Sequence, residues 1–370
     1  MNSRVLEVQH KLARTREVML EHGLKALRFH GVGWFAWCTA GGSSIIEITS
    51  DTGIAQVLVT LEDAFILTDV IEAERLREEE LTGLNGTFEL IAVPWAEHQR
   101  HEAFVQKFSP SSGIASDRPC DSEQALPTDI WRLRRTLTPN ERDRLRRVGS
   151  LASQAMSEVL QAATPTMTEL ELAAASAAAL LTRGLTPAVI LAAGARRLPR
   201  YRHAPATPEQ LGSSAMLVFC ARGQGLIANL TRFVTFKPFS KELEARHSSV
   251  REIEAQVLNA TRIGGTLAES HRVLERAYAT HGFADQILKH HQGGLAGYAT
   301  REVLANAHSS EMIEPWMAFA WNPSLPCAKI EDTFLLHPTG VLEDVTFDPN
   351  WPSVPVAGRK RPIPFKVDVL

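Results

Sequence analysis

The sequence predicts a mixed α/β (α+β) protein of two domains, and three observations lead to this prediction. A chain of 370 residues is longer than one hydrophobic core usually serves. Short strand-like runs alternate with helical segments along it, which is typical of α/β folds. A capping-box helix start, Thr138-Pro139-Asn140-Glu141, follows a basic segment and marks a second unit. We therefore expect domains over residues 1–130 and 131–370.

The amino-acid composition limits the binding partners and the cellular compartment that we expect for this protein. Hydrophobic residues make up 44% and charged residues 22% of the chain, as in globular proteins, and the formal net charge is -3. This balance gives no basic field, so we expect neither nucleic acid nor membrane as a partner. Residues 1–21 lack the apolar core of a signal peptide, and no apolar run is long enough to span a bilayer. The four cysteines form no CxxC pair, so we expect a cytoplasmic protein without structural zinc or disulfides.

The first domain should combine a small sheet with helices. Apolar positions at helical spacing predict helices, and short β-branched or aromatic runs predict strands. We expect helices over residues 5–27, 70–81 and 96–108, and strands over residues 34–37, 56–60, 64–68 and 88–93. The strands 56–60 and 64–68 should form a hairpin, and a loop over residues 109–129 should close the domain.

The second domain should contain longer helices. Thr168-Glu169-Leu170-Glu171 is another capping box, ahead of an alanine-rich segment that ends at Gly184. The predicted helices cover residues 139–163, 168–183, 243–263 and 266–281. The predicted strands cover residues 188–193, 216–220, 230–236, 316–321, 330–336 and 341–347.

One stretch of this domain gathers residues able to do chemistry. It runs from His290-His291-Gln292-Gly293-Gly294 through Arg301-Glu302 to Asn322 and Glu331. Glycines beside ionisable groups often let the backbone approach a bound molecule. Apolar strands that end in a polar residue hold that side chain rigidly. The alternative is a set of core histidines with satisfied hydrogen bonds and ordinary strand ends.

Four segments in order carry a family resemblance: Tyr201-Arg202-His203-Ala204-Pro205, Gly225 to Arg232, His290-His291-Gln292-Gly293, and Trp321-Asn322-Pro323 with Glu331-Asp332-Thr333. On these segments the chain resembles the superfamily of methionine aminopeptidases, Xaa-Pro aminopeptidases (prolidases) and creatinase. The resemblance implies a C-terminal domain with the pita-bread fold. It also implies a smaller creatinase/prolidase-like N-terminal domain, which contains Glu72 to Leu76, and a homodimer.

The resemblance implies that five side chains hold two divalent metal ions in the peptidases of this superfamily. Two aspartates, one histidine and two glutamates supply the ligands, because closely spaced hard cations need anionic oxygen. The matching positions here are Val218, Asn229, His291, Asn322 and Glu331. Only His291 and Glu331 keep the ligand type. We therefore expect no metal and no other cofactor.

The resemblance to creatinase implies an enzyme that acts without metal and uses a histidine as its proton shuttle. The matching position here is His203. Histidine suits this task because its unperturbed pKa lies near neutral pH. A further family histidine is replaced by Arg301, which can clamp a carboxylate but cannot act as a base. We expect His203, His291 and Glu331 to be catalytic. The expected substrate-binding residues are Asn229, Arg232, His290, Arg301, Glu302, Asn322 and Lys329.

These assignments predict a metal-independent enzyme with hydrolase-like chemistry on a C–N bond. Its substrate would be a small polar amide, guanidino or amino-acid-like molecule, and lyase or isomerase chemistry stays open. One alternative is a non-catalytic pseudo-peptidase that binds a ligand or a protein partner. Another is a metallo-aminopeptidase with a single weakly held ion. At the residue level, His203 could be an ordinary loop histidine, and Lys329 could simply pair with Glu331 or Asp332.

Overall fold

The computed structural model describes residues 3–108, 113–120 and 122–367. The chain divides into two compact units. The first comprises Met1–Glu141 with Gln224–Leu226, and the second comprises Arg142–Gly223 with Ile227–Leu370. Each unit mixes helices and strands, as the sequence predicted.

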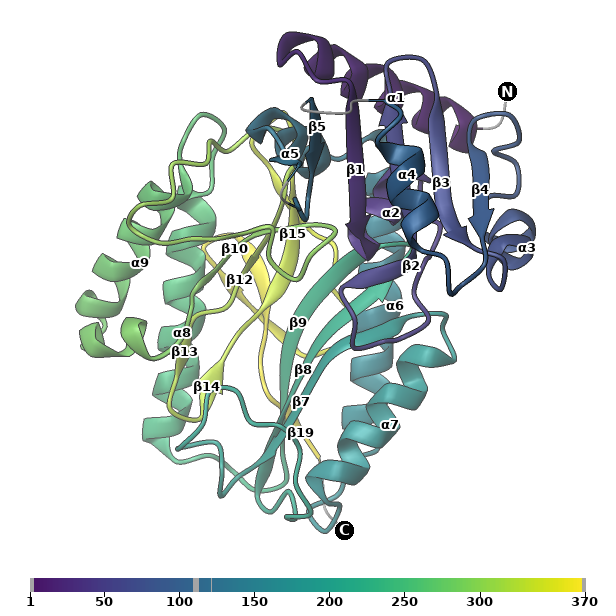
Figure 1. Ribbon diagram of the computed structural model, residues 1–370. Helices are drawn as coiled ribbons and strands as arrows, with labels where there is room; N and C mark the ends of the chain where they lie inside the picture. The colour runs from purple at the N-terminus through teal and green to yellow at the C-terminus, as the bar shows by residue number, and fades with distance from the viewer. Residues whose placement is uncertain (1–2, 109–112, 121, 368–370) are drawn as a thin grey trace. The chain divides into compact units, whose positions relative to one another are not determined.

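The first unit is built on a mixed sheet of six strands in the order β4-β3-β2-β1-β5-β6 (Figure 1). The strands are β1 (Ala26–Gly31), β2 (Thr52–Thr60), β3 (Ala64–Asp69), β4 (Glu89–Val93), β5 (Ile114–Ser116) and β6 (Gln124–Ala125). The helices are α1 (Ser3–Glu21), α2 (Val32–Cys38), α3 (Ala73–Arg75), α4 (Gln99–Val105) and α5 (Thr128–Arg135), and a π-helical turn, Leu76–Glu80, continues α3. The predicted hairpin is confirmed, because β2 and β3 pair antiparallel.

Two predictions for this unit were wrong. The run expected as a strand at residues 34–37 lies in α2, whose residues Trp34, Phe35, Ala36 and Trp37 are all buried. A segment buried on every side shows no helical periodicity, so its apolar run resembles a strand. The predicted loop over residues 109–129 contains β5 and β6 and the start of α5. Its residues 109–112 and 121 lie outside the described residues.

The second unit contains two sheets. One has the order β19-β9-β8-β7 and the other β11-β10-β12-β15-β16. Their strands are β7 (Thr186–Gly194), β8 (Ser214–Gly223), β9 (Leu226–Thr235), β10 (Gly293–Ala296), β11 (Val303–Leu304), β12 (Ala318–Trp321), β15 (Asp332–Leu336), β16 (Leu342–Asp344) and β19 (Phe365–Lys366). Two small hairpins are formed by β13 (Ser324–Leu325) with β14 (Ala328–Lys329) and by β17 (Ser353–Val356) with β18 (Arg359–Pro362).

Each sheet of the second unit is covered by its own pair of helices (Figure 1). Helices α6 (Pro139–Gln161) and α7 (Glu169–Leu181) lie against β7, β8 and β9, with Ala152, Leu180 and Phe219 in their shared core. Helices α8 (Lys241–Ala260) and α9 (Leu267–Thr280) lie against the other sheet, with Ile253 and Phe319 in theirs. A 3₁₀ segment, Ala284–Lys289, leads from α9 to the stretch that carries the histidines. Asn229 and Arg232 lie in β9 and Lys329 lies in β14, whereas the other candidate residues lie in segments that connect these elements.

Local sequence explains where these helices begin. At α7 and α9 a threonine side chain accepts from the third helical N–H, and the glutamate there accepts from the threonine N–H. Thr138 and Glu141 make the same two hydrogen bonds at the start of α6. Such boxes satisfy backbone donors that a helix start otherwise leaves unpaired. The helix starts predicted from Thr138, Thr168 and Thr266 are therefore confirmed.

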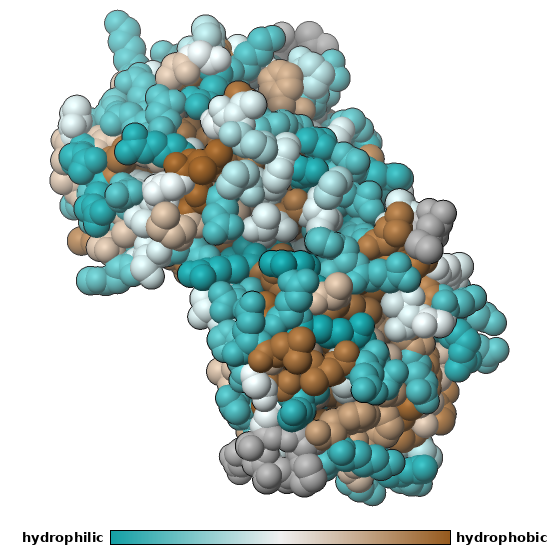
Figure 2. All heavy atoms as spheres, turned by 90° about the horizontal axis from the view of Figure 1, so that it is seen from above, coloured by the Kyte–Doolittle hydropathy of each residue, from teal (hydrophilic) through white to brown (hydrophobic). Residues whose placement is uncertain are grey.

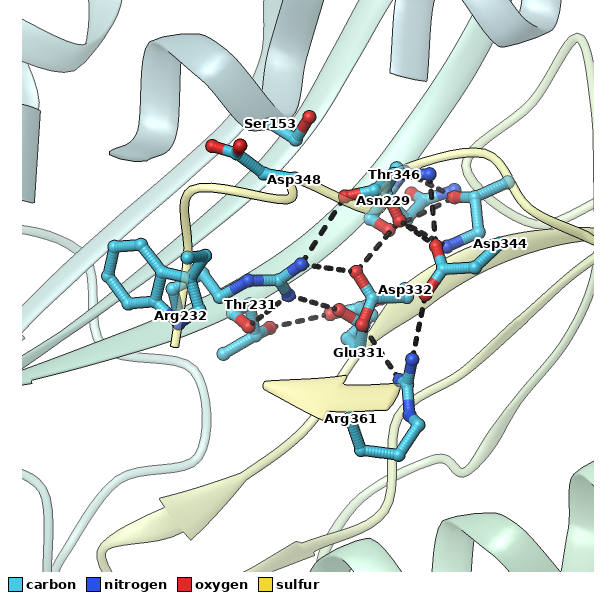
Figure 3. Close-up of polar contacts among 12 residues, drawn as sticks. Ser153, Asn229, Thr231, Arg232, Glu331, Asp332, Asp344, Thr346, Asp348 and Arg361 are labelled. Atoms are coloured by element: carbon cyan, nitrogen blue, oxygen red, sulfur yellow. Dashed lines mark hydrogen bonds and ion pairs between the residues drawn. The ribbon is translucent and has the colours of Figure 1, made fainter. Parts of the chain in front are cut away.

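A buried ion network joins distant parts of the second unit (Figure 3). Arg361 of β18 binds Glu254 of α8 at 2.6 Å, Asp332 of β15 at 2.7 Å and Asp344 of β16 at 2.7 Å. Arg232 of β9 binds the other oxygen of Asp332 at 2.7 Å. Two arginines thus compensate three carboxylates across both sheets, and those of Glu254 and Asp332 are fully buried.

The surface has the character expected from composition. Figure 2 shows one face, on which hydrophilic side chains predominate and hydrophobic ones gather in patches. Among the described residues, no helix has the length and apolar character needed to cross a bilayer.

Candidate active site

A cavity of about 470 Å³ in the second unit brings most of the predicted site residues together. It is lined by Val189, Leu191, His203, Val218, Cys220, His291, Thr300, Arg301, Leu304, Asn322, Lys329 and Glu331. Strands β7 and β8 supply an apolar wall through Val189, Leu191 and Val218. The polar wall comes from residues far apart in sequence, so the fold creates this grouping.

Glu331 is the carboxylate of this lining, and cations already surround it. Its Oε1 accepts from Arg301 Nη2 at 2.6 Å, while its Oε2 lies 3.1 Å from Lys329 Nζ. Thr231 Oγ1 donates to the same Oε2 at 2.9 Å. Burial alone would raise the pKa of Glu331, but Lys329 and Arg301 outweigh it and lower that pKa. Glu331 is therefore ionised, and the lining carries two positive charges and one negative.

Three histidines meet at the edge of the cavity. Nε2 of His290 lies 2.9 Å from Nε2 of His203, so the two rings share one proton. The rings of His290 and His291 stack with centroids 4.5 Å apart. One ligand atom from each of the three lies within 4.8 Å of the others.

These histidines are neutral at physiological pH. Burial, followed by the charge of Lys329, lowers the pKa of His203. Burial and Arg301 lower the pKa of His291 to about 4, and burial lowers that of His290 to about 2. A neutral imidazole can accept a proton from a substrate or a water. In the tautomer in which His203 donates from Nε2 to His290, Nδ1 is the nitrogen of His203 left for that task.

Two amide side chains have unused polar atoms. Asn322 Oδ1 is buried at the cavity wall without a hydrogen-bond partner among the described residues. Asn229 is 0% exposed, and neither atom of its amide has such a partner. Its backbone is held by Thr333, whose Oγ1 accepts from Asn229 N at 2.7 Å and donates to Asn229 O at 3.0 Å. Buried polar atoms without partners destabilise a fold and often mark a functional site.

These residues do not fit the two divalent ions that the resemblance implies. Val218 offers no donor atom, and Asn229 and Asn322 offer neutral amides where carboxylates would compensate the charge. The carboxylate of Glu331 binds an ammonium and a guanidinium. The three-histidine group could ligate a single ion, but Lys329 and Arg301 oppose a cation there. The donor set and its charge thus favour an anion.

Some predicted site residues lie elsewhere. Arg232 turns away from the cavity and binds Asp332 in the interior (Figure 3), because an arginine buried beside a carboxylate is stabilised by pairing with it. Glu302 does not line the cavity, and its Oε1 accepts from Tyr298 N at 2.9 Å within the turn after β10. His290 and Asn229 lie behind the lining rather than in it.

The glycine pair has a structural explanation. Gly293 has φ +95 and Gly294 has φ +145, both in the region that disfavours other residues. A Cβ on Gly293 would lie 2.1 Å from Ala320 O, and one on Gly294 2.3 Å from Val303 O. The glycines therefore allow β10 to approach β12 and β11. The packing of these strands accounts for the glycine pair without a bound molecule.

A second, outer cavity of about 650 Å³ was not predicted. It is lined by Pro199, Arg200, Tyr201, Arg202, His203, Gln286, Lys289, His290, His291 and Pro326. His203 and His291 line both cavities. The sequence held a signal, since cations flank the histidines in Arg200-Tyr201-Arg202-His203 and Lys289-His290-His291.

Comparisons with known proteins agree with this geometry. The chain matches the solved structure of a Xaa-Pro dipeptidase from Bacillus anthracis with 17% sequence identity and a TM-score of 0.76, over 92% of this chain and 98% of that one. It matches a prolidase from Pyrococcus horikoshii OT3 with 16% sequence identity and a TM-score of 0.77, over 91% of this chain and 98% of that one. It also matches the solved structure of a dipeptidase PepE from Mycobacterium ulcerans with 18% sequence identity and a TM-score of 0.76, over 99% of each chain. No curated protein matches the chain. The predicted pita-bread fold with a prolidase-like first domain is confirmed.

A family model extends the match to the sequence itself. The model of metallopeptidase family M24 matches residues 143–338, which is more than half of the 370-residue chain. The matched segment contains every residue of the inner cavity. The chain therefore belongs to metallopeptidase family M24.

Proposed function

We propose that this M24 protein is a metal-independent enzyme that cleaves a C–N bond in a small polar molecule bearing a carboxylate. Amides, guanidino compounds and amino-acid-like molecules belong to this class. One observation carries the proposal: Lys329 and Arg301 occupy both oxygens of Glu331, and of the other four metal-ligand positions only His291 keeps a ligand type. The same wall presents the neutral imidazoles of His203 and His291.

Substrate binding follows from the unused donors and acceptors. Arg301 Nε is buried without a partner among the described residues, and one N–H of Lys329 is used by Glu331. Both cations can therefore hold a substrate carboxylate through charge-assisted hydrogen bonds. Asn322 Oδ1 can accept from the amide or guanidino N–H of the substrate. These contacts would fix the C–N bond beside His203.

His203 would then move the protons. Its Nδ1 takes a proton from a water molecule, and the water oxygen bonds to the carbonyl or guanidino carbon. The C–N bond breaks with its electron pair going to nitrogen, and His203 returns the proton to that nitrogen. His290 holds the ring through the 2.9 Å contact, so the positive charge that develops on His203 is shared with a second imidazole.

A substrate screen with two controls tests this function. The purified protein, treated with a chelator, is incubated with N-acyl amino acids, dipeptides and guanidino acids, and products are identified by mass spectrometry. We expect turnover that survives chelation, and His203→Gln should lower kcat roughly 10²- to 10⁴-fold. Hydrolysis, elimination and isomerisation differ in product mass, so the same measurement assigns the reaction.

Metal analysis supplies the opposing outcomes. Loss of activity on chelation, with recovery on adding Mn²⁺, Co²⁺ or Zn²⁺, would overturn metal independence and favour an M24 metallo-aminopeptidase with a single ion. Binding of a carboxylate ligand without turnover of any compound would favour the second candidate, a non-catalytic binding protein. That candidate is supported by the His290 contact, which occupies Nε2 of His203.

A further inference from the structure

The outer cavity has an unusual charge. Arg200, Arg202 and Lys289 line it together with the three histidines, and no carboxylate belongs to the lining. Like charges brought together repel each other unless a counter-charge is bound. The neighbouring Arg196 and Arg197, in contrast, bind Glu209 and Glu169.

The three cations lack protein counter-ions. Among the ion pairs of the described residues, none includes Arg200, Arg202 or Lys289. Arg202 donates from Nη2 to the neutral Gln286 Oε1 at 2.5 Å, and its buried Nε has no partner. Burial lowers the pKa of Arg202 and outweighs the weaker opposing effect of the nearby Asp285 carboxylate, which forms no ion pair with it. The missing counter-charge can come from a ligand.

The two cavities share His203 and His291. A molecule that reaches from Arg301 and Lys329 into the outer cavity must therefore pass these two rings. Its middle would lie beside the group assigned as acid and base, and its far end would lie among three cations. The exposed ring of Tyr201 also lines this outer end.

We propose that the substrate carries a second anionic group, which binds in the outer cavity through Arg200, Arg202 and Lys289 while its carboxylate binds at Arg301 and Lys329. This inference rests on the proposed function, because it takes the inner cavity as the carboxylate site. The chemical class is a small dianion whose reacting bond lies between its charges. The second group is a carboxylate or a phosphate ester, since both accept from guanidinium and ammonium donors.

Calorimetric titration of the full-length protein tests the proposal. The probes are linear dicarboxylates from succinate to azelate, monocarboxylates of equal chain length, and the matching ω-phosphonocarboxylates. At low ionic strength we expect one chain length of dianion to bind about tenfold more tightly than its monoanion, and this gain should shrink as salt screens the charges. The better of the two dianion series identifies the second group.

Paired variants locate each charge. The double variant Arg200→Gln/Lys289→Gln changes two exposed side chains and should abolish the dianion advantage while leaving monoanion binding unchanged. Arg301→Met should weaken both kinds of probe. Arg272→Gln, an exposed arginine of α9, is the control and should change neither. Melting temperatures verify that each variant is folded.

The outcomes separate the two claims. Equal binding of dianions and monoanions, with Arg301→Met weakening both, overturns the second anionic group and leaves the proposed function standing. Dianion binding that responds to the outer variant but not to Arg301→Met keeps the outer site and overturns the inner carboxylate site. No binding of any probe at millimolar concentration overturns the inference.

Discussion

Among single residues, Lys329 has the widest electrostatic influence on the site. Its ammonium lies 3.1 Å from Glu331 and lowers the pKa of His203. The alternative weighed from sequence, a Lys329–Glu331 ion pair, is what the structure contains. Its consequence for His203 could not be read from sequence, because His203 is 126 positions away and the fold alone brings the two together.

Lys329 should set the acidic limit of activity. His203 has a lowered pKa, so its base form persists below pH 6.5, and the acidic limb of kcat/KM should lie below that pH. Lys329→Met removes a positive charge, which makes protonation of His203 easier and should move the limb to higher pH. The profile is measured from pH 4 to 8, with Lys237→Met, an exposed lysine, as control. A limb that stays in place would exclude His203 as the base or Lys329 as its neighbour.

Asn229 should trade stability for function. Its amide is fully buried with no hydrogen-bond partner in the described part of the chain, so Asn229→Leu, similar in size, should raise the free energy of unfolding by roughly 1–3 kcal/mol. Asn229→Asp buries a charge instead and should lower that free energy by about 3 kcal/mol. Urea denaturation measures both. A destabilised leucine variant would mean that the amide has bridging partners.

At the level of single residues, the sequence did not predict which charged side chains pair with each other. The sequence did not predict that Arg301, expected at the substrate, also donates to Glu331, or that Arg232 pairs with Asp332. Arg301 and Glu331 are 30 residues apart in the sequence, and Arg232 and Asp332 are 100 residues apart. Their positions depend on the contact between β9 and the residues beside β15. Motif spacing identifies the residue types at a site. It does not say which charges neutralise one another.

At the scale of elements, local chemistry decided what could be predicted. The capping boxes at Thr138 and Thr168 identified helix starts because each box satisfies backbone donors within four residues. The structure adds a third box, at Thr266. Helix α2 was missed because its burial comes from tertiary contacts, including Trp34 stacked on Phe29 at 4.7 Å. Elements fixed by local hydrogen bonds were therefore predictable, and an element fixed by the surrounding core was not.

Helix α8 should give the protein an acid-sensitive contact. His247 of this helix packs between the rings of Phe233 and Phe239, and burial lowers its pKa to about 3. Its neutral form stabilises the fold above pH 6.5, and this contribution is lost as the pH falls toward 3. In this pH range the free energy of unfolding should fall by up to roughly 1.4 kcal/mol per pH unit because of His247.

Denaturation as a function of pH checks this contact. His247→Leu should remove the extra acid sensitivity, whereas His308→Leu, at an exposed position, should retain it. Parallel pH dependence of His247→Leu and the unmodified protein would show that other groups cause the acid sensitivity.

For the whole molecule, the buried ion network should matter more than any single helix cap. Arg361→Met would leave Glu254, Asp332 and Asp344 with too little compensating charge, and we expect a loss of about 3–5 kcal/mol. Arg359→Met, two residues away on the same strand, should cost less than about 1 kcal/mol, since Arg359 bonds only the exposed side of α8 through Asn259. Equal losses in the two variants would contradict a special role for Arg361.

The Arg361 network also sets a condition on synthesis. Glu254, Asp332 and Asp344 all precede Arg361 in the chain, so they leave the ribosome before the cation that neutralises them. A nascent chain that has reached Asp344 holds every strand of the two sheets except β19, but burying these carboxylates at that stage has a high free-energy cost. The second unit should therefore stay open during translation and close only once β18 has emerged. Chains held on the ribosome by a C-terminal linker that spans the exit tunnel, one ending before and one after residue 361, should differ sharply in protease resistance.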